Sequence, residues 1–356
     1  MSYTNGLDNP ELYFQAKNYS GNASTNAITL DGSEDMQPDW VWLKSRSFAQ
    51  NHENYDSVRG ATKRLYNNLT NAEDTNSTGL TGFNSDGFTL GSSNAINKSG
   101  ETFASWNWKA GTSFSNDASS TGVGTIDSTG SVNTDAGFSI ISYTGTGSTG
   151  TVAHGLGATP GMIIIKERNN ATSWIVYHHK NTSAPATDYL LLNSTQATDD
   201  YADYFNDTEP TSSVFTIDTA GDINGSSDTY IAYCFAEKQG YSKFGSYEGN
   251  GNNDGTFVYT GFKPAWVMTK SIDSTSNWEI KDNKRSTFNT VDDYIKANAN
   301  AAEDTGVSSH AMDFLSNGFK HRGNNDEVNG SGEAYIYMAF AESPFTNSSG
   351  VPNNAR

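Results

Sequence analysis

Histidine, cysteine and carboxylate side chains are the groups in this chain that could support catalysis or hold a metal. His178 and His179 are adjacent, but neighbours on a strand point to opposite faces, so a metal shared by both would need a further ligand from elsewhere. We therefore expect the six histidines to be surface or turn residues. The sequence contains no phosphate-cradling glycine loop, no Gly-x-Ser-x-Gly elbow and no His-Glu-x-x-His helix.

Paired carboxylates are the groups that glycan-cleaving enzymes require at a defined separation. The best candidates are Glu73 with Glu303 and Asp74 with Asp304, which stand at matching places in a repeated segment. They lie in Asn- and Thr-rich stretches that are typical of solvated loops. A glycosidase would also be expected to have one elaborated site rather than several matching ones. The sequence therefore favours a non-enzymatic protein with no catalytic residues.

One cysteine and two acidic loops complete the candidates for nucleophile or metal chemistry. Cys234 aligns with Asn107 and Ala339 in a repeated strand, which excludes a nucleophile common to all copies. A single cysteine also excludes an internal disulfide framework and a cysteine-rich zinc site. The loops at residues 31–35 and 252–255 are acidic enough for calcium, but neither has an EF-hand pattern. We expect no cofactor, and structural calcium stays an open alternative.

Two further residue types could serve binding. Tyr201 and Tyr204, taken as exposed aromatics, could stack on sugar rings, and they are the candidate binding residues. A lysine ends the same apolar run three times, as Lys44, Lys166 and Lys270. We expect each lysine to lie at a strand end with its amine in solvent.

Internal repetition is the strongest signal in the sequence. The run PDWVWLK at 38–44 recurs as PGMIIIK at 160–166 and as PAWVMTK at 264–270. A closing segment recurs at 101–108, 228–235 and 333–340. It alternates with period two, as expected for a half-buried strand with Trp106 and Trp108 facing the core.

The repetition predicts an all-β fold of three tandem β-sandwich (jelly-roll-like) repeats of about 100 residues each, with a compact barrel as the alternative. Helical periodicity is nearly absent, and the best helix candidate is residues 291–302. The expected order is an N-terminal anchor segment (1–12), the first copy (13–111), a linker or added hairpin (112–136), the second copy (137–240), the third copy (241–345) and a flexible tail (346–356).

Composition narrows the class of protein. Aromatic residues make up 12% of the chain, which argues for a folded protein. The net charge of −18 argues against a nucleic-acid partner, because phosphate binding needs a basic face. No apolar run is long enough for a membrane span, so we expect no membrane insertion. Residues 1–6 have neither a basic head nor an apolar stretch, so we expect no signal peptide.

Several motifs resemble a repeat of tailed-phage virion proteins that are common in marine and cyanobacterial phages. They are PDWVWLK at 38–44, YDSVRGATK at 55–63, FNSDGF at 83–88 and WNWKAG at 106–111, continued by FSIISYTGTG at 138–147 and HGLG at 154–157. The third copy departs, with Lys284-Arg285-Ser286-Thr287 in place of the RGATK stretch. Such proteins are usually described as tail-fibre or other surface proteins of the particle.

The resemblance implies a non-enzymatic structural protein of a phage virion, first of all a tail fibre or receptor-binding (host adhesion) protein. A capsid-decorating head fibre or spike protein and a lectin-like polysaccharide-binding module are the alternatives. The implied partners are further copies of the chain in a homotrimer, other tail or capsid proteins and, for a lectin, host surface polysaccharide. The implied location is the virion surface, after synthesis in the bacterial host cytoplasm.

Overall fold

The computed structural model describes residues 7–354 of the chain, and the predicted all-β class is confirmed. Strands account for 41% of the residues and helices for 7%. The strands are short and are separated by turns rich in Gly, Asn and Ser, which is the local pattern expected from the sequence.

The elements follow one another in a similar order in each copy. The first copy, after the 3₁₀ helix η1 (Pro10–Leu12), contains β1 (Phe14–Ser20), β2 (Asn26–Ile28), β3 (Trp40–Ser45), β4 (Glu53–Asp56), β5 (Lys63–Arg64), β6 (Asp74–Thr75), β7 (Leu80–Phe83), β8 (Phe88–Leu90), α1 (Asn94–Asn97) and β9 (Thr102–Trp108). The next segment and the second copy contain β10 (Thr112–Asn116), α2 (Ala118–Thr121), β11 (Ser128–Asn133), β12 (Phe138–Thr144), β13 (Gly150–Ala153), β14 (Met162–Glu167), β15 (Ile175–His178), β16 (Asp188–Leu191), β17 (Asp199–Asp200), α3 (Ala202–Phe205), β18 (Val214–Ile217), α4 (Gly221–Asn224) and β19 (Thr229–Phe235). The third copy contains β20 (Ser242–Glu248), β21 (Phe257–Tyr259), β22 (Phe262–Ser271), β23 (Glu279–Asp282), β24 (Ile295–Lys296), the 3₁₀ helix η2 (Ser308–His310), β25 (Met312–Leu315), β26 (Gly318–His321), α5 (Asp326–Asn329) and β27 (Ala334–Pro344).

Three larger antiparallel sheets share one strand order. The first is β1-β9-β3-β4, the third is β20-β27-β22-β23-β24, and the second contains β12-β19-β14-β15-β16-β17. In each sheet the closing strand pairs with the opening strand on one side and with the strand of the apolar run on the other. Trp108 thus lies opposite both Phe14 and Trp40, and Phe235 lies opposite both Phe138 and Met162.

A smaller sheet covers the outer face of each larger one, which makes the architecture β-sandwich-like. These sheets are β2-β8-β7, β13-β18 and β21-β26-β25. Each encloses a separate hydrophobic cluster with its larger sheet. The jelly-roll description of three tandem repeats goes beyond this pattern and stays a prediction.

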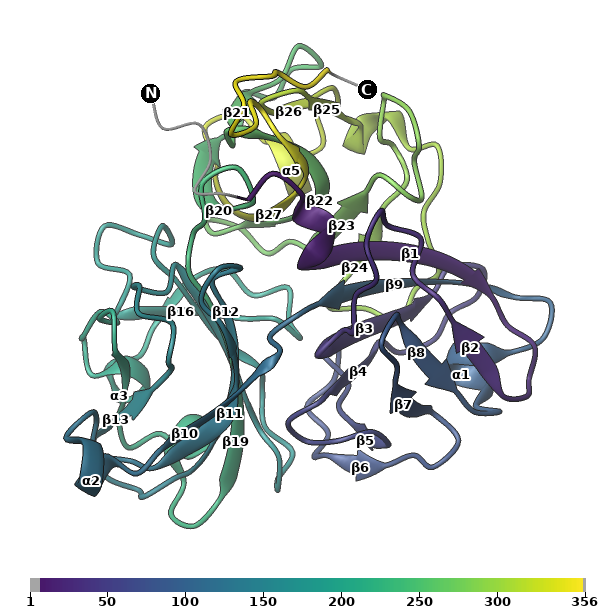
Figure 1. The fold of residues 1–356 in the computed structure, drawn as a ribbon. Helices are drawn as coiled ribbons and strands as arrows, with labels where there is room; N and C mark the ends of the chain where they lie inside the picture. The colour runs from purple at the N-terminus through teal and green to yellow at the C-terminus, as the bar shows by residue number, and fades with distance from the viewer. Residues whose placement is uncertain (1–6, 355–356) are drawn as a thin grey trace.

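The inner faces of the three larger sheets meet in one hydrophobic core (Figure 1). All seven tryptophans of the chain lie in this core, and none is more than 2% exposed. Trp40 stacks on Trp108 of its own copy and on Tyr233 of the second copy, each at 4.5 Å between ring centroids. Trp108 in turn meets Trp266 of the third copy at 5.7 Å. The prediction that Trp106 and Trp108 face the core is confirmed, and the core that they face belongs to all three copies.

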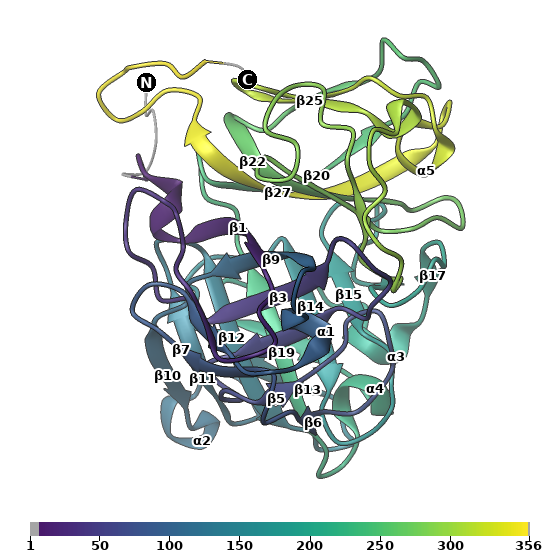
Figure 2. The same ribbon diagram turned by 90° about the vertical axis from the view of Figure 1, so that its right-hand side faces the viewer.

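The segment between the first two copies extends the second sheet. β10 and β11 pair with each other, and β11 pairs with β12, so the sheet has eight strands. Figure 2 shows β10 and β11 beside β12 and β19, and shows β27 crossing above β1 and β9.

Both ends of the described chain are tied to the body. Leu7 is buried in the central core, and Ser348 N donates to Asp8 Oδ1 at 2.7 Å. Asn353 Nδ2 donates to Pro344 O at 2.7 Å, so the described part of the predicted flexible tail is fixed to the end of β27. Residues 1–6 of the predicted anchor and residues 355–356 lie outside the described residues.

The predicted helix at residues 291–302 is wrong. This segment holds β24, and Val291 bridges Met312. Val291 packs in the outer cluster of the third copy while Ile295 packs in the central core, so residues one helical turn apart do not form one helical stripe. No helix within residues 7–354 is long and apolar enough to cross a membrane.

Candidate functional site

Charged side chains converge at the junction of the first and second copies, beside the central core. Asp56 and Arg59 form a fully buried ion pair with 2.5 Å between Oδ2 and Nε. Tyr233 of the second copy donates its hydroxyl to Asp56 Oδ2 at 2.7 Å. Burial alone would lower the pKa of Arg59, but the Asp56 carboxylate raises it above its ordinary value. The Arg59 guanidinium therefore stays charged, and the pair joins two copies through Tyr233.

The junction of the third and first copies repeats this arrangement. Asp282 and Arg285 form a buried ion pair at 2.5 Å, and Trp106 Nε1 of the first copy donates to Asp282 Oδ2 at 2.9 Å. Arg285 thus occupies the place of Arg59, since each pairs with the aspartate three residues before it. The third copy was interpreted as departing from the RGATK stretch. The structure corrects this for the arginine, which the third copy keeps as Arg285.

Glu73 and Glu303 are not residues of solvated loops, as the sequence predicted, because both are mostly buried at these junctions. Glu73 binds Arg168 of the second copy at 2.9 Å and is 11% exposed. Glu303 binds Arg46 of the first copy at 2.8 Å and is 4% exposed. Glu73 therefore connects the first copy to the second, and Glu303 connects the third copy to the first. Their neighbours Asp74 and Asp304 are 48% and 42% exposed.

Hydrogen bonds between ring nitrogens and backbone carbonyls form a third set of contacts between copies. Matching positions after the apolar runs hold His52, Trp174 and Trp278, whose backbone N–H groups bind Asn68, Asn193 and Asn298. The contacts are Trp174 Nε1 to Tyr66 O at 2.9 Å, Trp278 Nε1 to Leu191 O at 2.9 Å, and His52 Nε2 to Lys296 O at 3.0 Å. Each copy therefore reaches one neighbour in the same cyclic order.

The prediction that the six histidines are surface or turn residues is wrong about the exposure of five of them. His52, His154, His178, His310 and His321 are buried, and only His179 is half-buried. Burial lowers the pKa of His154 to about 4 and the pKa of His178 to about 3. His178 and His179 bind the backbone carbonyls of Tyr337 and Phe244 in the third copy, so this adjacent pair serves packing between copies.

The prediction that the repeated lysines reach solvent is also wrong. Lys44, Lys166 and Lys270 are fully buried, because each shares the inner face of its strand with the core residue two positions earlier, namely Trp42, Ile164 and Met268. Each amine donates to the carbonyl of the following residue, namely Ser45 O at 2.9 Å, Glu167 O at 2.7 Å and Ser271 O at 2.6 Å. Burial lowers the pKa of all three amines from 10.5 to about 8.

We predict that wild-type stability rises relative to that of a Lys166→Met variant between about pH 8 and pH 10.5. In this window the amine is neutral in the folded chain but still protonated in the unfolded chain. The unfolded state then binds more protons, so the free energy of unfolding increases with pH. The upper limit is about 1.4 kcal/mol per pH unit for one proton. Urea unfolding at stepped pH measures the difference, and a difference that is constant with pH would contradict a buried amine.

The two candidate sugar-stacking residues differ in exposure. Tyr201 is 45% exposed, whereas Tyr204 is buried at 6% and donates its hydroxyl to Asp222 Oδ2 at 2.9 Å. The expectation that Tyr204 is exposed is therefore wrong. Tyr204 instead supports Tyr201 from below at 4.9 Å between ring centroids.

The remaining sequence candidates also have structural partners. Cys234 is buried, and burial raises the pKa of its thiol. In the two acidic loops, Asp31 pairs with Lys17 and Lys284, and Asp254 pairs with Lys320. These carboxylates already face ammonium groups, which compete with calcium.

A hollow in the surface beside residues 111–131 contains Asp39, whose pKa is raised by burial. Its carboxylate accepts from Ser57 Oγ at 2.7 Å and from Ala110 N at 2.9 Å. Asp39 is the one acidic residue among the described residues that line this hollow. A pair of carboxylates for glycan cleavage is therefore not assembled there.

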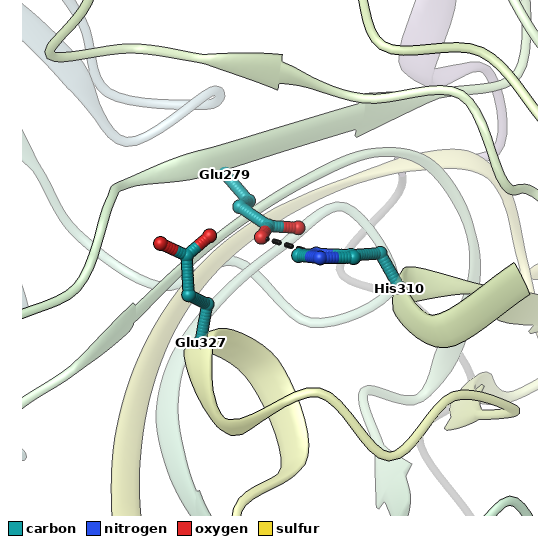
Figure 3. A group of neighbouring side chains, drawn as sticks. All are labelled: Glu279, His310 and Glu327. Carbon is teal, nitrogen blue, oxygen red and sulfur yellow. Dashed lines mark hydrogen bonds and ion pairs between the residues drawn. The ribbon is translucent and has the colours of Figure 1, made fainter. Parts of the chain in front are cut away.

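One cluster was missed at the sequence level. Glu279, His310 and Glu327 each offer a ligand atom, and these atoms lie within 4.8 Å of one another (Figure 3). Burial alone would raise the pKa of Glu279, but Lys281 and His310 outweigh it and lower the pKa to about 2. The three residues come from β23, η2 and α5 with no motif spacing, so the sequence carried no signal for them.

The fold and its junctions define an all-β, β-sandwich-like protein in which one chain supplies three sheets to a shared core. The family model for the domain of unknown function DUF7483 matches residues 9–344, and the chain belongs to this family. No curated protein and no solved structure matches the chain.

Proposed function

We propose that the chain is a non-enzymatic structural protein of a tailed-phage virion, most directly a tail fibre or receptor-binding protein. The observation that carries this proposal is the use of its charged residues. Glu73 and Glu303 bind arginines of neighbouring copies. The buried aspartates that pair with Arg59 and Arg285 accept from side chains of neighbouring copies, so these charges hold the body together. The resemblance of residues 38–44 and 55–63 to repeats of phage virion proteins is the reason for proposing that the chain is part of a virion.

In this proposal the three copies are jelly-roll-like β-sandwich repeats that present their loops outward from a rigid centre. The shared strand order of the larger sheets supports this description. The formal charge of −18 suits a surface protein that must stay soluble at high local concentration.

Homotrimerisation is retained as part of the proposal, by analogy with fibres. The inner faces of the three sheets are already buried within one chain. A trimer would therefore use outer surfaces, where Phe257 and Tyr259 of β21 are 44% and 59% exposed.

Antibodies against the folded chain test the proposal on purified particles of the phage that encodes it. We expect labelling at the tail, and we expect the free chain to bind host cells and to block infection. Labelling of heads without such a block would favour the capsid-decorating alternative. Particles that carry no label, with an antibody against a known virion protein as positive control, would refute a virion location.

A lectin-like binding module is the second candidate, because Tyr201 presents an exposed ring backed by Tyr189 and Tyr204. Tyr189 packs on Tyr204 at 4.7 Å, and Tyr204 packs on Tyr201 at 4.9 Å. Such a fixed aromatic face suits stacking on a sugar ring. Silence of the folded chain on an array of host envelope glycans would remove this candidate.

A further inference from the structure

Three potential metal ligands meet inside the third copy, away from the junctions. Glu279 lies on β23, His310 ends η2 and Glu327 lies on α5. Figure 3 shows the two carboxylates and the imidazole directed toward one another. Glu279 Oε1 and His310 Nδ1 are 2.6 Å apart, and one ligand atom from each of the three residues lies within 4.8 Å of the others.

Outer partners hold each of these side chains in place. Lys281 Nζ lies 3.1 Å from Glu279 Oε2, which leaves Oε1 to face His310. Asn277 Nδ2 donates to Glu327 Oε1 at 2.7 Å. The Tyr294 ring stacks on the His310 ring at 4.4 Å and 12°. Such outer contacts orient the ligands of protein metal sites.

A buried histidine of β26 also interacts with the charges of this cluster. His321 is fully buried, and neither of its ring nitrogens has a hydrogen-bond partner within residues 7–354. It is near enough to Glu279 and Lys281 to interact with their charges. Buried polar groups almost always have a partner, so an ion with bound water in this interior would account for an otherwise unsatisfied imidazole.

The other two copies show that folding does not require this set of residues. Register places Glu53 and Ile175 at the position of Glu279, each opposite the residue that precedes the buried lysine. Glu53 is satisfied by Arg64 at 2.9 Å and by the Tyr55 hydroxyl at 2.6 Å. In the second copy the position is apolar. The helix position of Glu327 holds Ala95 in the first copy and Asp222 in the second. Of the three copies, the third alone therefore has a carboxylate at both positions.

We propose that Glu279, His310 and Glu327 bind one divalent transition-metal cation of the Zn²⁺ class. Two carboxylates and an imidazole form a mixed O/N ligand set that suits Zn²⁺, Mn²⁺ or Fe²⁺, whereas Ca²⁺ takes oxygen ligands throughout. The bound cation joins β23, η2 and α5 and so braces the outer half of the third copy. This site is independent of the proposed virion function.

Calorimetric titration of the metal-stripped full chain with Zn²⁺ tests the proposal. We expect one equivalent of Zn²⁺ to bind, and one equivalent of Co²⁺ to give the absorption bands of a low-symmetry site. Glu327→Gln is the decisive variant, because Glu327 is only partly buried and glutamine can keep the contact from Asn277. This variant and His310→Gln are each expected to weaken Zn²⁺ binding by at least ~10-fold.

Two matched controls separate this site from other binding. Glu53→Gln changes the equivalent buried glutamate of the first copy, and His179→Gln removes the half-buried histidine; both are expected to keep full affinity. Urea unfolding of each metal-free variant checks that it folds. The proposal is overturned if Zn²⁺ does not bind stoichiometrically, if folded Glu327→Gln binds as tightly as wild type, or if His179→Gln abolishes binding.

Discussion

Trp108→Ala is expected to lower the free energy of unfolding of the whole chain by about 3–5 kcal/mol, the range for large aromatic truncations in a packed core. Trp108 is fully buried and lies where the first and third copies meet. Its ring contacts are Phe14 at 5.0 Å, Trp40 at 4.5 Å, Trp266 at 5.7 Å and Phe340 at 5.6 Å. Because these rings belong to two copies, the cavity weakens both.

Urea unfolding followed by tryptophan fluorescence and by circular dichroism measures this effect. The two signals are expected to shift together, since the core is common to all copies. Phe288→Ala is the matched control, because Phe288 is 77% exposed and its removal should change stability by no more than about 0.5 kcal/mol. Early melting of part of the chain, with the remainder unchanged, would contradict a shared core.

Arg285→Leu is expected to cost about 3–5 kcal/mol of stability, because it leaves the buried Asp282 carboxylate without its cation. Asp282 and Glu303 are 1% and 4% exposed, and both bind Arg285. Removal of the guanidinium leaves Asp282 with the Trp106 indole and two backbone N–H donors, and leaves Glu303 with Arg46. The junction of the third and first copies therefore loses the centre of its charge network.

Lys98→Leu provides the comparison for this variant. Lys98 and Glu101 also form an ion pair three residues apart, but Lys98 is 46% exposed. Exposed pairs contribute about 0–1 kcal/mol, so this change should be nearly neutral. Equal losses for Arg285→Leu and Lys98→Leu, measured by urea unfolding, would mean that the junction network contributes no more than a surface ion pair.

Local pattern predicted the strands of the fold well. The alternation of Trp106 and Trp108 identified a core-facing stripe, and the repeated apolar runs identified β3, β14 and β22. These features depend on residues close together in sequence, where period-two patterning is informative. The sequence did not predict that the stripes of three copies face one another, because each stripe is equally consistent with a separate sandwich core.

The predictions that placed polar side chains in solvent were wrong for a shared reason. The partners of Glu303 and Glu73 are arginines in another copy, Arg46 and Arg168, far away in sequence. Composition around each glutamate indicated a solvated loop, and only the docking of copies buries it. The lysines at the ends of the apolar runs, such as Lys44, were misjudged similarly, since backbone carbonyls that accept from their amines have no signature in the side-chain sequence.

The candidate metal ligands could not be predicted from spacing. Glu279, His310 and Glu327 stand on three elements that meet only when α5 and η2 pack near β23. Tyr204 was expected to be exposed and is buried, because it points inward from the short helix α3. Its neighbour Tyr201 is exposed as expected.

Whether the three sheets share one core is tested most directly by differential scanning calorimetry of the whole chain. A shared core predicts a single transition whose calorimetric enthalpy matches its van 't Hoff enthalpy, so that their ratio is about 1. Three resolved transitions, or a ratio near ~3 as for independent repeats, would contradict the shared core.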